Sequence, residues 1–168
     1  MNKYTVAVLV RNQFGVLNRV TSMFRRRQFT ISALTVSETE SNELSRITVV
    51  FDGEETNKQQ LINQLYKLPD VCSIKEFTPE HSISCELLLI KMQNESATRE
   101  DIHAAAEAFG AVTVDYSKDS IMFRLTDVSG RIDDFIDLMR DYTILEICRT
   151  GSVSLEKGST TIRQTINF

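Results

Sequence analysis

The feature that most constrains how this chain folds is one order of β-rich and amphipathic segments that occurs twice along 168 residues. Each half reads strand, helix, strand, strand, helix, strand, judged by the spacing of its apolar residues. The expected strands are Tyr4–Val10, Thr30–Val36, Leu44–Phe51 and Val71–Phe77 in the first half, and Ser84–Met92, Ala111–Tyr116, Ile121–Leu125 and Thr143–Thr150 in the second. The pattern therefore predicts two small domains of the same type.

Four amphipathic helices connect these strands. In each helix, apolar residues recur at intervals of three and four positions, which places them on one face. The apolar faces comprise Val16, Leu17, Val20, Met23 and Phe24; Leu61, Ile62, Leu65 and Leu68; Ile102, Ala105, Ala106 and Phe109; and Ile132, Phe135, Ile136 and Met139. Pro69 stops the second helix, because proline cannot continue a helix, and Gly110 ends the third.

Two copies of this order predict an α+β fold of two ferredoxin-like βαββαβ sandwiches, each an antiparallel sheet with helices on one face. We expect a first domain over residues 1–78, a linker over 79–82, and a second domain with a tail over 83–168. The Ser/Thr-rich tail, Ser152–Phe168, is expected to be loosely ordered or dependent on a partner.

The first strand is apolar on both faces, since Val6, Val8 and Val10 alternate with Ala7 and Leu9. Helices cover only one face of such a sheet, so something else has to bury the other face or an edge. Each half is also small enough to be marginally stable alone. The sequence therefore predicts a dimer, with a second protomer or the sister domain as the cover.

Composition excludes several classes of partner and site. A net charge of −4 and a pI near 5.3 argue against nucleic acid or an anionic membrane, both of which favour a basic face. The three cysteines form no CxxC pair, which is typical of free thiols in a reducing cytoplasm, so we expect a cytosolic protein. His81 and Cys85 lack metal-ligand spacing, and no metal site is expected.

The residues offer little to a catalytic reaction. The chain has only two histidines, and no Ser/His/Asp or Cys/His arrangement is suggested by their spacing. The acidic residues near the start of the last helix suit the helix dipole and need no catalytic role. We therefore expect a chain that is not an enzyme and carries no catalytic residue.

The segment from Asn12 to Val20 is the strongest candidate for a binding site. Gly15 lets the backbone approach a ligand without a Cβ in the way, and the amides that follow open a helix, where they favour a carboxylate. Asn12 adds an amide that can both donate and accept. These groups form a cradle for the head of a free amino acid, although the same residues also suit an ordinary strand-to-helix turn.

Several segments resemble one known family. They are LVRNQFGVLNRVTSMFRRRQFTISALTV, LSRITVVF, LYKLPDVCSI, LLLIKM and the stretch Leu138–Asp141. Together they resemble the small regulatory subunit of acetolactate synthase (acetohydroxyacid synthase) over nearly the whole chain. The resemblance implies a regulatory role in valine, isoleucine and leucine biosynthesis. It also implies that this chain activates a large catalytic subunit, which holds thiamine diphosphate, magnesium and FAD, and carries no cofactor itself.

The resemblance further implies that the first half is an ACT domain. Two ACT domains would pair edge to edge as a homodimer, with a branched-chain amino acid, chiefly valine, bound between protomers as a feedback inhibitor. Carried over by position, the effector-binding residues are Asn12, Gly15, Val16 and Leu17 of one protomer, with Thr30 and Ile31 of the other.

One stretch departs from the family. Where the family reads Arg-Gly-Tyr-Asn-Ile, this chain reads Arg27-Gln28-Phe29-Thr30-Ile31. Thr30 offers one hydroxyl in place of an amide, and Gln28 adopts a positive φ less readily than the glycine of the family would. The departure predicts a weakened or altered valine response, with activation retained.

The alternative is a free-standing ACT-type amino-acid sensor that regulates a different partner. Other ferredoxin-like proteins fit less well. Leu44–Phe51 lacks the exposed aromatic residues of an RNA-binding sheet, and the basic glycine-rich loop of acylphosphatases is not reproduced.

Overall fold

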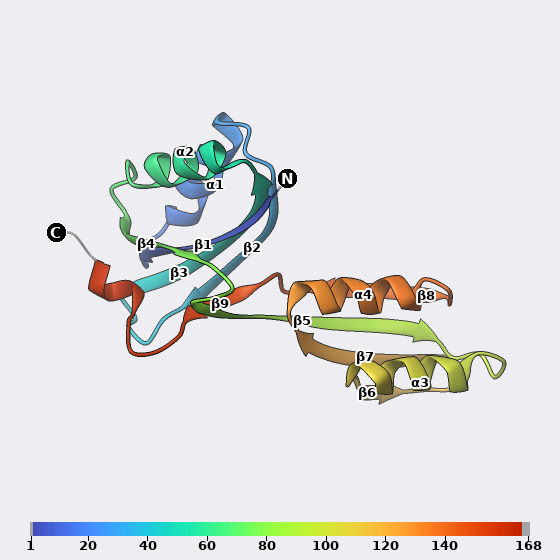
Figure 1. Cartoon of the computed structure of the whole chain (residues 1–168). Coiled ribbons are helices and arrows are strands. Elements are labelled where there is room, and N and C mark those ends of the chain that lie inside the picture. The colour runs from blue at the N-terminus through green and yellow to red at the C-terminus, as the bar shows by residue number, and fades with distance from the viewer. Residues whose placement is uncertain (1, 166–168) are drawn as a thin grey trace. The chain divides into compact units, whose positions relative to one another are not determined.

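The computed structural model describes residues 2–165 (Figure 1). By contacts the chain divides into two compact units. The first runs to Ser84 and takes in the chain again from Val153, and the second covers Cys85–Ser152.

The first unit contains one antiparallel sheet and two helices. Its elements in chain order are β1 (Asn2–Arg11), α1 (Val16–Arg26), β2 (Ile31–Glu38), β3 (Leu44–Gly53), α2 (Glu55–Leu65) and β4 (Val71–Phe77). The strands lie in the order β2-β3-β1-β4. The predicted βαββαβ sandwich is confirmed, and its core lies between the sheet and the helices, with Val8, Phe51 and Leu61 at most 1% exposed.

The second unit repeats this plan. Its elements are β5 (Ser82–Gln93), α3 (Arg99–Phe109), β6 (Val112–Tyr116), β7 (Ser120–Asp127), α4 (Ser129–Met139) and β8 (Ile144–Arg149), with the strands in the order β6-β7-β5-β8. The stripes of α3 and α4 pack on this sheet, where Ile90, Ile102 and Phe135 are fully buried. The second sandwich is confirmed as well.

The tail differs from its prediction. Its described part forms a strand, β9 (Val153–Glu156), which pairs with β5, and a short 3₁₀ helix, η1 (Ile162–Thr165). The expectation of a loosely ordered segment is wrong for these residues, because partners distant in sequence hold them. Arg46 donates to the carbonyl of Ser154, whose hydroxyl also bonds to that of Ser84.

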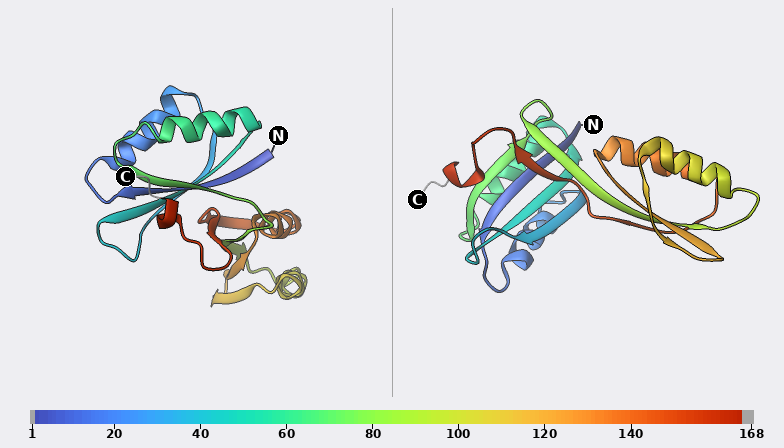
Figure 2. Two further views of the ribbon diagram at one scale, coloured as in Figure 1. Left: turned by 60° about the vertical axis from the view of Figure 1, so that its left-hand side comes forward. Right: turned by 90° about the horizontal axis from the view of Figure 1, so that it is seen from below.

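The tail also lies on the helix-free side of the first sheet. Figures 1 and 2 show η1 on the side of this sheet opposite α1 and α2. From the sequence we predicted that a second protomer or the sister domain covers this face of the sheet, and that the tail belongs to the second domain. The contacts instead group the tail with the first unit. None of the helices in residues 2–165 is long and apolar enough to cross a membrane.

A buried ion network stabilises the second unit. Glu86 on β5 is 3% exposed and accepts hydrogen bonds from Nε and Nη2 of Arg149 and from the hydroxyl of Ser129. Burial alone would raise the pKa of Glu86, but these bonds outweigh it and the pKa is lowered. The carboxylate is therefore favoured in the folded state over the unfolded chain.

We expect Glu86→Gln to lower the free energy of unfolding at pH 7 by about 2–3 kcal/mol, because Arg149 loses its charged acceptor. A lowered folded pKa stabilises the protein above the unfolded pKa of about 4.3, and the effect is lost as pH falls further. The variant and the parent should therefore converge in acid. Urea unfolding at several pH values measures this, with the exposed Glu146→Gln as a control that should change stability by less than about 0.5 kcal/mol.

Candidate functional site

The loop between β1 and α1 has the backbone that its glycine predicts. Gly15 sits at the N-cap of α1 with φ 83° and ψ −4°, a left-handed conformation that other residues adopt at a cost. The first helical bond runs from the amide of Arg19 to the carbonyl of Gly15. The amide of Val16 donates to the carbonyl of Gln13 at 3.3 Å, so the amides of Leu17 and Asn18 are the ones in this first turn that remain available to an anionic group.

Asn12 ties this loop to the turn between β2 and β3. Its backbone amide donates to the carbonyl of Glu43 at 2.7 Å, and its Nδ2 donates to the carbonyl of Asn42 at 3.1 Å. The side chain is exposed, and its oxygen accepts no hydrogen bond from the described residues. Asn12 can therefore accept a bond from an α-ammonium group while its donors hold the loop.

An ion pair that was not predicted from the sequence holds the N-terminal turn of α1. Nε of Arg19 lies 2.6 Å from Oδ2 of Asp70, whose side chain is only 11% exposed. The carbonyl of Asp70 also accepts a bond from the amide of Arg11 at the end of β1. A Cβ on Gly15 would lie 3.3 Å from Nη1 of Arg19, so this guanidinium borders the glycine turn.

The two apolar residues after the glycine have different surroundings. The side chain of Val16 is buried in the core of the first unit, and its amide donates to the carbonyl of Gln13, so neither group is offered to a ligand in this structure. Leu17 is 43% exposed, and the neighbouring Phe14 is fully exposed. Leu17 therefore remains a candidate for side-chain contact, and Phe14 is an apolar group beside the loop that the sequence analysis did not select.

Thr30 and Ile31 lie at the other end of the sheet from this loop. Ile31 pairs with Phe51, which pairs with Tyr4, whereas Arg11, just before the loop, pairs with Leu44. Tyr4 and Arg11 are seven residues apart, so the two groups are separated by roughly 24 Å along the strand at about 3.4 Å per residue. One protomer alone does not bring the predicted site together.

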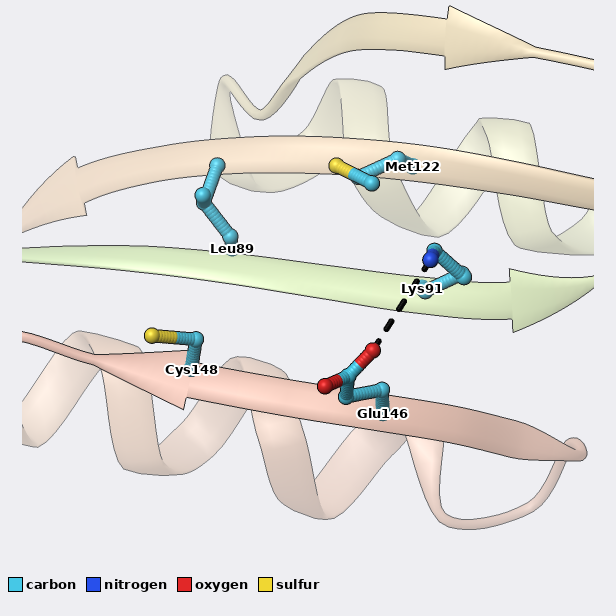
Figure 3. Close-up of a pocket in the computed structure, with 5 residues that line it drawn as sticks. All are labelled: Leu89, Lys91, Met122, Glu146 and Cys148. Carbon is cyan, nitrogen blue, oxygen red and sulfur yellow. Dashed lines mark ion pairs between the residues drawn. The ribbon is translucent and has the colours of Figure 1, made fainter.

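The described residues contain no group of three or more His, Cys, Asp or Glu side chains placed to hold a metal ion. A small apolar hollow of about 130 Å³ lies in the second unit, on the face of its sheet that the helices leave open (Figure 3). Leu89, Met122 and Cys148 line it, and at its rim Nζ of Lys91 lies 3.8 Å from Oε2 of Glu146. Leu89 and Lys91 alternate along β5, and Glu146 and Cys148 alternate along β8, so each pair lies on one face of its strand. This alternation is the only sequence pattern that could have pointed to the hollow.

The βαββαβ fold and the glycine turn are those of an ACT-type domain, and family models match both units of the chain. Residues 6–73 match the family model "AHAS small subunit-like ACT domain", and residues 85–158 match the model "Small subunit of acetolactate synthase".

Full-length relatives extend the match. The chain is 43% identical over 157 residues to the "Probable acetolactate synthase small subunit" of Archaeoglobus fulgidus, covering 94% of this chain and 98% of that one. It is 39% identical over 158 residues to the acetolactate synthase small subunit of Bacillus subtilis, covering 94% and 92%. The crystal structure of the Thermotoga maritima acetolactate synthase small subunit superposes with a TM-score of 0.86 at 30% identity, covering 95% and 100%. The chain belongs to the acetolactate synthase small-subunit family.

The backbone at Gln28 confirms the strain expected there. Gln28 has φ 57°, and it is the one residue other than glycine with a positive φ among residues 2–165. A side chain at such a position costs the folded state about 1–2 kcal/mol. Glycine removes this strain, but it also gives the unfolded chain more conformational freedom, which offsets part of the gain in stability. We expect Gln28→Gly to raise the free energy of unfolding by about 0.5–1 kcal/mol.

Chemical denaturation of the whole chain measures the difference. The matched control is Gln59→Gly, which places glycine inside α2 at an exposed position and should destabilise the protein by about 1 kcal/mol. A Gln28→Gly variant that was destabilised as much as the control would contradict the assignment of strain.

Proposed function

We propose that this chain is the non-catalytic regulatory subunit of an acetolactate synthase. In this proposal it activates the large catalytic subunit and mediates feedback inhibition by a branched-chain amino acid, with valine the first candidate. The observation that carries the proposal is the separation of the two halves of the site: the loop with Asn12 and Gly15 lies at one end of the sheet, and Thr30 lies at the other.

A homodimer through β2 would bring these halves together. β2 is an edge strand, so it can pair with a second copy of itself. A two-fold axis normal to the sheet makes that pair antiparallel, which sets the start of one β2 beside the end of the other. The end of β2 is near the loop, because Glu38 pairs with Ser45 and Ser45 pairs with Val10.

The groups gathered in this way suit an amino-acid head. The amides of Leu17 and Asn18 in the first turn of α1 would hold the carboxylate, and the oxygen of Asn12 would accept from the ammonium group. Thr30 of the partner subunit would add its hydroxyl. An asparagine there could make one more hydrogen bond, and losing such a bond costs about 0.5–1.5 kcal/mol, which is roughly threefold to tenfold in affinity.

Regulation would follow from linkage. A ligand held by both protomers stabilises one arrangement of the dimer, and the catalytic subunit would prefer the other arrangement. A coupling of about 1–3 kcal/mol between the two sites is enough for feedback inhibition.

The chemistry itself would belong to the large subunit. Thiamine diphosphate, magnesium and FAD are proposed to reside there, with no catalytic residue and no cofactor on this chain. The proposed compartment is the cytosol, where the three cysteines, which form no disulfide here, would stay reduced.

The direct test mixes this chain with its cognate large subunit and measures acetolactate formation from pyruvate, with and without valine, leucine or isoleucine. We expect activation by the chain, and inhibition that Gly15→Ala weakens while leaving activation intact, because the new Cβ meets Arg19. The control is Gly110→Ala, which strains an equally left-handed glycine, φ 74°, with no atom within 4 Å of the new Cβ. A chain that leaves the large subunit unaffected would favour the free-standing sensor.

The same assay tests the departure at Thr30. We expect Thr30→Asn to lower the concentration of valine that gives half-maximal inhibition by threefold to tenfold, because it adds one hydrogen bond. Thr113→Asn, at an exposed position on β6, is the matched control and should have no effect. Equal sensitivity in the parent and in Thr30→Asn would remove Thr30 from the site.

A further inference from the structure

A hollow of about 290 Å³ lies in the first unit between the helix-free face of its sheet and the C-terminal segment. Arg46, Lys75 and Phe77 line it from β3 and β4, Glu156 lines it from the end of β9, and Arg163 lines it from η1. This volume is near the lower end of the roughly 300–1,000 Å³ of pockets that hold small molecules.

Charged side chains of both signs surround this hollow. Nζ of Lys75 lies 2.8 Å from Oε2 of Glu156, and Nε of Arg163 lies 2.8 Å from Oε1 of Glu40. Both pairs join the C-terminal segment to the rest of the unit. The guanidinium of Arg46 has other partners, the carbonyl of Ser154 and the ring of Phe77, whose centroid is 5.4 Å away.

Three buried polar atoms at this hollow lack hydrogen bonds. They are Oε2 of Glu156 and both Nε and Nη2 of Arg163, and no other buried side-chain nitrogen or oxygen in the described residues is left in this way. Oε2 and Nε are close to opposite charges but are not aligned with them for a hydrogen bond. Nη2 of Arg163 has neither a hydrogen bond nor an ion pair among the described residues, and a ligand that accepts from Arg163 and donates to Glu156 would satisfy all three atoms, as native proteins satisfy nearly all such groups.

We propose that this hollow is a second binding site, for a small free α-amino acid. The carboxylate of the ligand accepts from Nη2 and Nε of Arg163, and its ammonium group donates to Oε2 of Glu156. Its side chain lies against Phe77 and Leu155. A simple anion would satisfy the guanidinium but leave Glu156 without a donor, whereas a zwitterion satisfies both. The site uses none of the residues of the Gly15 loop.

The ligand would touch the sheet and the C-terminal segment at once. Binding therefore stabilises the packed arrangement of residues 153–165, since a ligand favours the conformation that it binds. Amide hydrogen exchange in this segment should become slower when the site is filled.

Isothermal titration of the whole chain tests the site without any large subunit, so its outcome is independent of activation. The common L-amino acids are titrated one by one into the Gly15→Ala variant, in which the loop site is impaired. We expect at least one to bind with a stoichiometry of one per chain. Its amide, which lacks the carboxylate, and its deaminated acid, which lacks the ammonium group, should each bind at least tenfold more weakly.

Arg163→Ala and Glu156→Gln, added to this background, should each weaken binding at least tenfold. Arg26→Ala, which removes an exposed cation from α1, should not change it. Arg163→Lys keeps the charge and reports on folding, together with the melting temperature of each variant. The proposal is overturned if no amino acid binds, if the deaminated acid binds as tightly as the amino acid, or if folded Arg163→Ala binds like its parent.

Discussion

The pairing of β1 with β3 on one side and β4 on the other is the constraint on which the first unit depends. A strand paired on both sides and apolar on both faces can only be central, and Val6–Val10 are at most 1% exposed. The register of the sheet also places the glycine loop at one end and the start of β2 at the other, so the two parts of the predicted site lie apart within one protomer. This separation is a direct consequence of strand order and register.

Local patterns were enough to predict the elements of the fold. Apolar periodicity identified the eight main strands and four helices, and Gly15, expected in the turn between the first strand and the first helix, lies there in a left-handed conformation. The strain at Gln28 was predicted from a departure from the family pattern, which has glycine at this position, and the φ of 57° is in agreement. The strands, the helices and the glycine turn are set by residues close together in the sequence, so one sequence can reveal them.

Features that depend on distant residues were not predictable in this way. Arg19 and Asp70 are 51 positions apart, and neither differs in type from an ordinary surface residue. The ordered tail depends on Arg46 and Lys75, more than 75 positions earlier in the chain. Adjacent residues can also differ in burial, since the side chain of Val16 lies in the core and that of Leu17 is exposed. The joint site of two protomers stays a prediction, because its halves meet only across copies.

The return of residues 153–165 to the first unit has a consequence for biosynthesis. A ribosome makes the N-terminal sheet and both its helices long before it makes β9, so the nascent first unit lacks part of its cover while the second unit is being translated. During that interval the face around Phe77, with Arg46 and Lys75, is open to solvent, chaperones and other nascent chains. The last segment to leave the ribosome completes the first domain to fold.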